Sequence, residues 1–390
     1  MMKKPTLSLV LALLPLLAWG QLHRYDTGFN LSGTNFCDTI PLEVADNQLL
    51  LTVYIGGRPV KALLDTGSSQ GVVFANRLPA TLMDLGAVVS RDANGQTDTI
   101  RAAQMPVFRL GNIGIEGYVV SIHGADRLNR KYQFVIGFDL FNKGLSAKID
   151  VRNRRLILTD RRNHFDGETG QRLKYKLKWF VPYMIVSPFI RHADEVLFDT
   201  GFRGLYTMNK QSFDKHAYKS KNVGSQVEAV VEGQSQIGLH GAEQLAEVAF
   251  LHLDRLQVGD YELQDVRAKT TSGSSKVGAE LLQYGSVVLL PHRRTLLFQP
   301  YDGGESVRVG NTIQQMAFVP KGDAVCVGLV NPMSDAYREG FRQGDVVLEI
   351  DGRPIASFAQ FLAFPFVKGQ QHTFKLLGTD GQTRTVQSVR

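Results

Sequence analysis

Apolar and polar positions along the chain form one arrangement that occurs twice. Residues 48–74 contain an apolar strand, a Gly-Gly turn, a second apolar strand and then a polar turn that begins at Asp65. Residues 182–208 follow the same order and reach a polar turn that begins at Asp199. Short apolar runs separated by glycine turns indicate β-strands. Two copies of one β-rich unit are the simplest explanation of a pattern that recurs in the same order.

The agreement between the two copies continues downstream. Each copy has a predicted hairpin turn, then a short element that ends in Gly, and finally a group of basic residues that leads into a strand. The matched features are Asn94-Gly95 with His240-Gly241, Val135-Ile136-Gly137 with Lys276-Val277-Gly278, and residues 152–158 with residues 291–298. We therefore predict a mainly β protein with an N-terminal lobe over residues 21–165 and a C-terminal lobe over residues 166–300.

The length of the chain and the sequence after Pro300 indicate a third unit. The chain has 390 residues, of which 43% are apolar and 21% charged, which is the profile of a folded protein. At about 100 to 200 residues per domain, this length accommodates two or three domains. Residues 323–355 read as a strand, a turn, a short helix and a further strand that Gly344-Asp345 opens. We place a separate domain over residues 303–390.

The first twenty residues have the composition of a secretory signal peptide. A basic segment, Met1–Lys4, precedes a short apolar segment, Thr6–Ala18, and small residues follow at the expected cleavage site. An uncleaved membrane anchor is the alternative, but the apolar run is shorter than the roughly 20 residues of a spanning helix. We expect residues 1–20 to be removed and the mature chain to begin near Gln21, with no membrane segment after cleavage.

Charge and cysteine content change this picture little. The net charge is +7, and part of the surplus lies between Arg152 and Lys178. A basic run could contact nucleic acid or anionic lipid, but this one has no aromatic-rich nucleic-acid motif, so we interpret it as a solvated connector between the lobes. Cys37 and Cys326 lie far apart in different predicted domains, so a disulfide between the domains stays open but is not indicated by the sequence.

The two polar turns carry a recognisable motif. The turns Leu63–Ser69 and Leu197–Gly201 both contain Asp-Thr-Gly after an apolar strand, and they resemble the two catalytic signatures of pepsin-like and retropepsin-like aspartic proteases. In this resemblance, which spans about residues 38–300, Asn94-Gly95 takes the place of the flap and Val135-Ile136-Gly137 that of the element behind the first signature. The implied fold is a two-lobed pepsin/retropepsin-like acid protease fold. A third Asp-Thr-Gly, at Asp26, follows polar residues and is interpreted as chance.

The resemblance implies a chemistry and a role for each motif residue. Two carboxylates that share one proton can take a proton from water and give one to the scissile carbonyl. Asp65 and Asp199 would be these carboxylates, and Ser68 would hydrogen-bond Asp65 and make it the more readily ionised of the two. The residues expected to support the pair are Thr66 and Thr200, which would exchange hydrogen bonds across the pseudo-twofold axis, and Gly67 and Gly201, which would allow close backbone approach.

Two features depart from the family pattern. Phe202 stands where Ser, Thr or Ala is usual in the second signature, so a supporting bond near Asp199 would be lost. The expected flap residues are Asn94, Gly95, His240 and Gly241, and no tyrosine stands at the Asn94-Gly95 tip.

The C-terminal unit resembles a PDZ domain of the bacterial protease-associated type. The residues that carry this resemblance are Ser334-Asp335-Ala336, Gly340-Phe341 and Gly344-Asp345. Such domains bind extended peptides as an added strand. Met316, Ala317, Phe318 and Val319 lie where a carboxylate loop would be, but the usual Gly-apolar-apolar signature is missing. Capture of a C-terminal carboxylate and a simple packing role both stay open.

Other chemistries are set aside by the motifs. Ser272 and Lys276 have the spacing of a Ser/Lys dyad, but they lie in a Gly/Ser-rich loop. The chain contains no His-Glu-x-x-His motif, no Cys-His cluster and no nucleotide-binding glycine loop. We expect no metal and no cofactor.

The leader and the bacterial type of the PDZ-like domain predict export across the inner membrane into a periplasm. The two aspartate motifs predict an aspartic endopeptidase. We expect polypeptide substrates, a peptide or C-terminus ligand at the PDZ domain, no nucleic-acid partner and a monomer. One alternative is a non-catalytic peptide-binding or quality-control protein with a degenerate protease cleft. Another is a homodimeric retropepsin with one idle lobe, which the duplication makes unnecessary.

Overall fold

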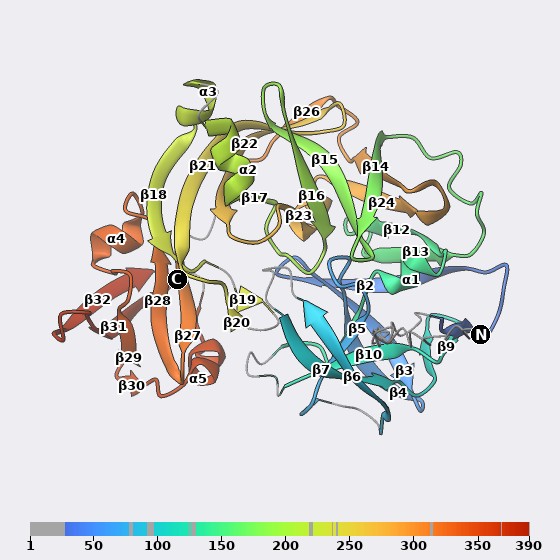
Figure 1. The fold of residues 1–390 in the computed structure, drawn as a ribbon, viewed down its shortest axis with the longest axis horizontal. Coiled ribbons are helices and arrows are strands. Elements are labelled where there is room, and N and C mark those ends of the chain that lie inside the picture. The colour runs from blue at the N-terminus through green and yellow to red at the C-terminus, as the bar shows by residue number, and fades with distance from the viewer. Residues whose placement is uncertain are drawn as a thin grey trace, which may run out of the picture.

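The computed structural model describes most of the chain after the predicted leader. It covers residues 28–77, 81–91, 97–124, 126, 130–217, 221–235, 237–238, 241–312, 315–367 and 369–389. The predicted leader, residues 1–20, lies outside the described residues. The protein is mainly β and has two lobes and a smaller C-terminal unit (Figure 1). The predicted fold class is confirmed at this level.

The first lobe combines strands that alternate between buried and exposed positions with short strands that are buried throughout, and it has one short helix. Its elements are β1 (Asn30–Leu31), β2 (Cys37–Ala45), β3 (Gln48–Ile55), β4 (Arg58–Leu64), β5 (Gly71–Phe74), β6 (Met83–Arg91), β7 (Thr97–Gln104), β8 (Phe108–Leu110), β9 (Ile113–Glu116), β10 (Val119–His123), β11 (Phe134–Ile136), α1 (Asp139–Asn142), β12 (Ser146–Asp150) and β13 (Arg155–Thr159).

The second lobe has longer strands and two short helices at its outer side. Its elements are β14 (Gln171–Lys178), β15 (Val181–Phe189), β16 (His192–Asp199), β17 (Tyr206–Asn209), α2 (Lys210–Ala217), α3 (Lys221–Gly224), β18 (Val227–Gly233), β19 (Ile237–Gly238), β20 (Gly241–Ala242), β21 (Ala246–Val258), β22 (Tyr261–Thr271), β23 (Lys276–Gly278), η1 (Ala279–Gln283), β24 (Gly285–Leu290), η2 (Pro291–Arg293), β25 (Thr295–Pro300) and β26 (Ser306–Arg308).

The two lobes repeat one order of strand pairing. In the first lobe β4 runs parallel to β11, β11 is antiparallel to β5, and β5 is parallel to β10. In the second lobe β16 runs parallel to β23, β23 is antiparallel to β17, and β17 is parallel to β22. The hairpin β6–β7 then corresponds to β18–β21. The internal repeat read from the sequence is therefore a repeat of topology.

A six-stranded antiparallel sheet joins the lobes. Its order is β2, β13, β12, β24, β25 and β14, and the join between the two halves is the pairing of β12 with β24 through Ala147 and Leu289. The basic segment that we interpreted as a connector contributes β13 and β14 to this sheet. It is a structural part of the junction, with its charged side chains mostly exposed.

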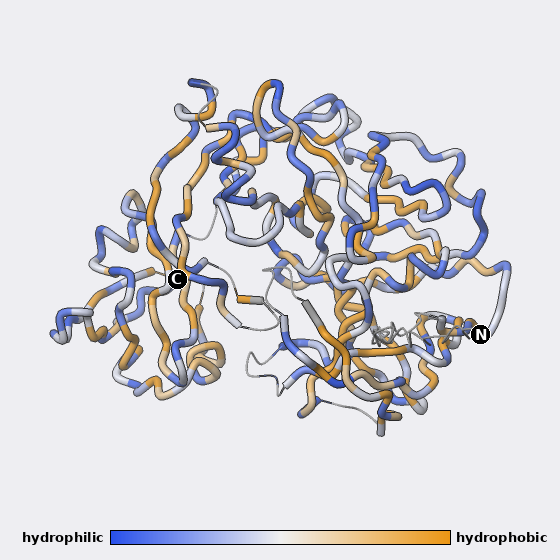
Figure 2. Tube along the Cα trace, in the orientation of Figure 1, coloured by the Kyte–Doolittle hydropathy of each residue, from blue (hydrophilic) through white to orange (hydrophobic). Residues whose placement is uncertain are grey.

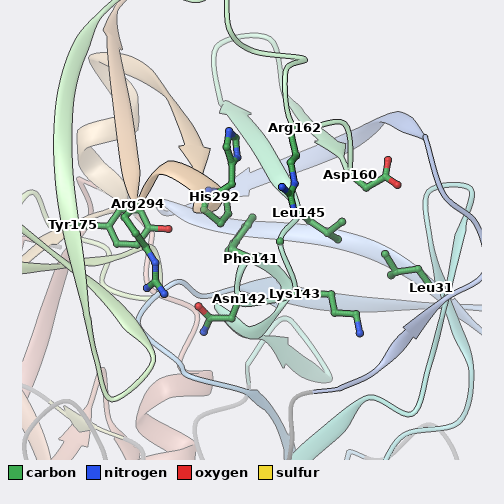
Figure 3. Close-up of a pocket in the computed structure, with 12 residues that line it drawn as sticks. Leu31, Phe141, Asn142, Lys143, Leu145, Asp160, Arg162, Tyr175, His292 and Arg294 are labelled. Carbon is green, nitrogen blue, oxygen red and sulfur yellow. The ribbon is translucent and has the colours of Figure 1, made fainter.

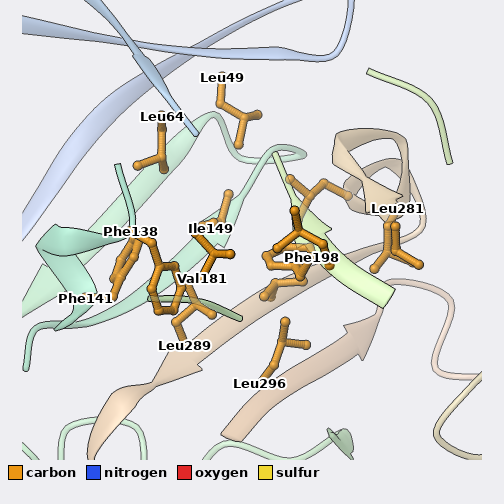
Figure 4. Packing of buried hydrophobic residues seen from close by; sticks show 14 of the residues in the cluster. Leu49, Leu64, Phe138, Phe141, Ile149, Val181, Phe198, Leu281, Leu289 and Leu296 are labelled. Atoms are coloured by element: carbon orange, nitrogen blue, oxygen red, sulfur yellow. The ribbon is translucent and has the colours of Figure 1, made fainter. Parts of the chain in front are cut away.

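One continuous apolar core runs through both lobes and the sheet between them. Leu64 and Phe198, the residues that precede the two aspartate turns, are both fully buried in this cluster. Figure 4 shows side chains of both lobes packed together, including Leu49 and Phe138 from the first lobe and Leu281 and Leu296 from the second. Hydrophobic positions follow the central strands and hydrophilic ones the outer loops (Figure 2). The two polar turns are thus anchored in buried strands.

The C-terminal unit has its own sheet and core. Its elements are β27 (Met316–Lys321), β28 (Ala324–Val330), α4 (Asp335–Glu339), β29 (Val346–Ile350), β30 (Arg353–Pro354), α5 (Phe358–Ala363), β31 (Gln371–Leu377) and β32 (Thr383–Val389). The sheet order is β27, β28, β29, β31 and β32, with β30 beside β29. Ser334 caps α4 by accepting a hydrogen bond from the Tyr337 backbone, and Gly340 ends that helix with a φ of 114°. The predicted strand, turn, helix and strand are therefore present.

The C-terminal unit is attached to the end of β18, the strand that corresponds to the flap strand β6. The Gln234 backbone donates a hydrogen bond to the Gly328 carbonyl of β28 at 2.8 Å. Beside this bond, Ala317 and Leu329 pack against Val248 and Phe250 of the second lobe. Figure 1 shows β27 and β28 beyond the ends of β18 and β21.

Candidate active site

The two aspartate turns meet between the lobes. Asp65 follows β4 directly, and Asp199 is the last residue of β16. A Cβ atom on Gly67 would lie 2.4 Å from a carboxylate oxygen of Asp199, and one on Gly201 would lie 2.5 Å from a carboxylate oxygen of Asp65. Any side chain at either glycine would displace the opposite carboxylate. The glycines are thus required by close approach, as expected from the sequence.

The threonines of the two turns lock the turns together by four reciprocal hydrogen bonds. The Thr66 backbone donates to Thr200 Oγ1, and the Thr200 backbone donates to Thr66 Oγ1, both at 3.0 Å. Thr66 Oγ1 then donates to the Phe198 carbonyl at 2.6 Å, and Thr200 Oγ1 donates to the Leu64 carbonyl at 2.8 Å. Both threonines are buried. The carboxylates are therefore held by rigid backbone on both sides.

Backbone N–H groups satisfy one oxygen of each carboxylate. Gly67 donates to Asp65 Oδ1 at 2.8 Å, and Gly201 donates to Asp199 Oδ1 at 3.0 Å. The Phe202 backbone adds a second donor to Asp199 Oδ1 at 3.1 Å. Phe202 has no hydroxyl to offer, but its turn still supports Asp199 through this N–H.

Ser68 does not take the place that we expected. Its hydroxyl donates to the Gln70 carbonyl at 2.8 Å rather than to Asp65. Asp65 therefore lacks the side-chain donor expected from Ser68, and the Gly67 N–H is the donor that favours its ionised form.

The electrostatics of the pair are unequal. Desolvation, the charge of Asp199 and a hydrogen bond with Asp199 together raise the pKa of Asp65 to about 8, and Lys276 only partly opposes them. Lys276 Nζ lies 3.6 Å from Asp199 Oδ2, and both side chains are 8% exposed. The protonated form is therefore favoured at Asp65, while the ammonium group of Lys276 lies against Asp199. The expectation that Asp65 is the more readily ionised partner is wrong in this arrangement.

Lys276 is the site residue that the sequence reasoning missed. We considered it only as a partner of Ser272, and the structure separates the two: Ser272 Oγ donates to Glu243 Oε2 at 3.3 Å, whereas Lys276 pairs with Asp199. The signal was present in the repeat, because Lys276 stands where the first lobe has the apolar Val135.

The predicted flap residues fall mostly outside the described residues. Asn94, Gly95 and His240 are among those not described, and Gly241 belongs to β20. β6 and β7 pair antiparallel on either side of residues 92–96, with Arg91 opposite Thr97. In the second lobe the connection between β18 and β21 contains the small hairpin of β19 and β20.

The predicted PDZ peptide-binding residues form most of β27. Met316, Ala317 and Val319 are buried, and Phe318 packs against Phe361 with ring centroids 4.6 Å apart. Their side chains are committed to the C-terminal core and to the junction with the second lobe. A ligand at β27 would therefore use the strand's backbone edge, which among the described strands pairs only with β28.

A separate pocket of about 380 Å³ lies beside the six-stranded sheet (Figure 3). Lys143, Arg162, His292 and Arg294 contribute its basic side chains, and it contains none of the predicted site residues. Within the described ranges, no three His, Cys, Asp or Glu side chains are grouped so that they could hold a metal ion. The described helices include none with the length and apolar character of a membrane span.

Comparison with known proteins gives a family match within the first part of the chain. Residues 51–140 match the aspartyl protease family. This segment runs from β3 into α1 and includes Asp65 and Gly137, while Asp199 lies outside it. The match supports a hydrolase of the aspartic type.

Whole-chain comparisons add less. No curated protein matches the chain. Among solved structures, basic 7S globulin from soybean is similar over 68% of this chain and 95% of its own, with 11% sequence identity and a TM-score of 0.42.

Proposed function

We propose that the protein is an aspartic endopeptidase in which Asp65 and Asp199 together activate one water molecule between the lobes. The observation that carries this proposal is the reciprocal threonine lock, with hydrogen bonds of 2.6 to 3.0 Å that hold the two carboxylates against the opposite glycines. Such close placement of two carboxylates is costly unless they share a proton, and a shared proton serves acid–base catalysis.

The charge distribution assigns a role to each carboxyl group. Asp199, which is charged, takes a proton from water while the water oxygen attacks the peptide carbonyl carbon. Asp65 gives its proton to the carbonyl oxygen, so that a neutral tetrahedral diol forms. Asp199 then protonates the leaving nitrogen and Asp65 recovers a proton from the diol as the C–N bond breaks. Both carboxyl groups return to their starting states.

We also propose that the chain is exported to a periplasm and that the C-terminal unit is a PDZ domain that binds a peptide or a partner. Export is supported by the composition of residues 1–20. Peptide binding is supported by β27, which lies at one end of the sheet order, as strand addition requires.

One observation favours a second candidate, a non-catalytic peptide-binding protein. The ion pair between Lys276 and Asp199 neutralises one carboxylate, so the two aspartates could persist without turnover. In that case the space between the lobes would hold peptides without cleaving them.

Peptide cleavage and peptide binding, measured on the same variants, separate these two functions. The chain beginning at Gln21 is incubated with a diverse peptide pool from pH 3 to pH 8, and products are identified by mass spectrometry. We expect cuts by the wild type, none by Asp65→Asn, and retained peptide binding by Asp65→Asn. Peptide binding without cuts by a folded wild type at every pH would instead establish the second function.

A further inference from the structure

The lysine beside the dyad breaks the symmetry of the two lobes. β23 runs parallel to β16 with Lys276 opposite Leu197, just as β11 runs parallel to β4 with Val135 opposite Leu63. Lys276 and Val135 therefore occupy corresponding positions. Val135 packs in an apolar cluster with Leu63 and Tyr132, whereas Lys276 reaches Asp199. At corresponding positions, the first lobe thus has an apolar side chain, Val135, and the second lobe has a positively charged one, Lys276.

The position of Lys276 is well defined by its surroundings. The residue is 6% exposed, and its backbone is fixed between β16 and β17 by pairing with Leu197 and Thr207. Its ammonium nitrogen also lies 5.7 Å from the centre of the Phe202 ring. Phe202, the departure from the family pattern, therefore lies against the same ammonium group that contacts Asp199.

We propose that Lys276 is a positioning residue that keeps Asp199 charged, makes Asp199 the base and Asp65 the acid, and moves the working range of the enzyme toward acid pH. This inference rests on the proposed function, because it concerns how the dyad of that function is charged. An opposite charge within about 4 to 6 Å lowers the pKa of a carboxyl group by roughly 1 to 3 units. Because the dyad titrates as a pair, Lys276 acts on both of its ionisation steps.

The other charged groups around the site do not provide the same effect. On the first-lobe side, the charges of Asp65 and Arg130 act on Tyr132, and Arg203 of the second lobe acts on the same tyrosine. On the second-lobe side, Lys269 lies on β22, opposite Thr207, and the charge that acts on it is that of Glu243. Unlike these groups, Lys276 is in ion-pair contact with Asp199.

The test is the pH dependence of peptide cleavage by Lys276→Met, which removes the charge but keeps a long side chain. We expect both limbs of the profile of kcat/KM to move to higher pH, by about 1 to 3 units. Lys276→Arg restores a positive charge and should keep the profile near that of the wild type. Lys215→Met removes a lysine from an exposed position on α2 and should leave the profile unchanged.

A second readout does not depend on turnover. Carboxyl carbon shifts of Asp65 and Asp199 are followed by NMR against pH in the wild type and Lys276→Met, and are assigned with Asp65→Asn and Asp199→Asn. We expect the dyad to titrate at higher pH in Lys276→Met. If that variant does not fold, Lys276→Gln takes its place.

The two readouts separate failure of the inference from failure of the proposed function. Unchanged carboxyl titration or an unchanged pH profile in Lys276→Met overturns the role of Lys276, even if the enzyme is active. A wild type that cuts no peptide overturns the proposed function, while an upward shift of the carboxyl titration still supports the charge assignment.

Discussion

Replacing Thr200 by valine removes half of the lock between the two aspartate turns. The Thr200 hydroxyl donates to the Leu64 carbonyl at 2.8 Å and accepts from the Thr66 backbone at 3.0 Å. Valine has nearly the same volume but leaves both of these buried groups without a partner. Each unsatisfied group costs about 1 to 3 kcal/mol, so Thr200→Val should lower the free energy of unfolding by about 2 to 6 kcal/mol.

Two matched variants isolate the contribution of the lock. Thr200→Ser keeps the hydroxyl and loses one methyl group, which should cost about 1 kcal/mol. Thr207→Val removes a buried hydroxyl that makes one hydrogen bond, to the Lys269 carbonyl at 2.8 Å, and should also cost about 1 kcal/mol. The free energies are measured by urea unfolding followed by circular dichroism.

The reciprocal geometry adds a test by double mutation. The Thr66 and Thr200 hydroxyls each make two of the four bonds, with none in common, but both pairs of bonds hold the same two turns. Loss of one pair lets the turns relax, so Thr66→Val combined with Thr200→Val should cost less than the sum of the two single changes. The reasoning about the lock would be refuted if Thr200→Val were as stable as Thr200→Ser and the slope of the unfolding free energy against urea concentration were unchanged.

The remaining predictions concern other parts of the molecule. Gly201→Ala places a Cβ 2.5 Å from the Asp65 carboxylate and should lower cleavage by about 100-fold or more, which a kcat/KM measurement with matched peptides checks. Burial lowers the pKa of Lys269 from 10.5 to about 8, so the folded state loses this proton before the unfolded state does. Stability of the wild type relative to Lys269→Met should therefore rise by about 3 kcal/mol between pH 8 and pH 10.5, and a constant difference in urea unfolding would contradict this. Leu329→Ala removes a fully buried side chain from the junction and should speed proteolytic release of the C-terminal unit, whereas unchanged release would show that the junction does not depend on this contact.

The dyad itself could be predicted from the sequence because the chain contains two copies of one unit, which can be compared with each other. Asp-Thr-Gly alone is too short to be informative, and one of its three copies, at Asp26, lies outside the repeat. The apolar strand before each of the other two turns reappears as β4 and β16, both with buried ends. Repeated strands impose repeated backbone geometry, so Thr66 and Thr200 had to face each other once the lobes packed.

The distribution of charge within the site could not be predicted in the same way. Whether Ser68 turns toward Asp65 or toward the Gln70 carbonyl is a choice of side-chain rotamer that no pattern records. The reach of Lys276 to Asp199 depends on the register between β16 and β23, which pairs residues far apart in the sequence. The substitution of lysine for valine within the repeat was visible, but its partner was not.

The strand β27 shows a similar limit. Its residues predict a strand, but the sequence does not indicate that one face of this strand packs in the C-terminal unit and the other against the second lobe. Phe318 enters the aromatic core of the C-terminal unit, while Ala317 packs against the second lobe. Contacts between separately folded units depend on how their surfaces meet, and local periodicity carries no information about that.

The central claim is that one chain supplies both aspartates of a working pair, and complementation tests it most directly. Asp65→Asn and Asp199→Asn are prepared separately, and peptide cleavage is measured for each variant, for their mixture and for the wild type. We predict cleavage by the wild type alone, because each variant lacks one half of an intramolecular dyad. Cleavage by either single variant would contradict the shared mechanism, and cleavage restored in the mixture would show that two chains build the site.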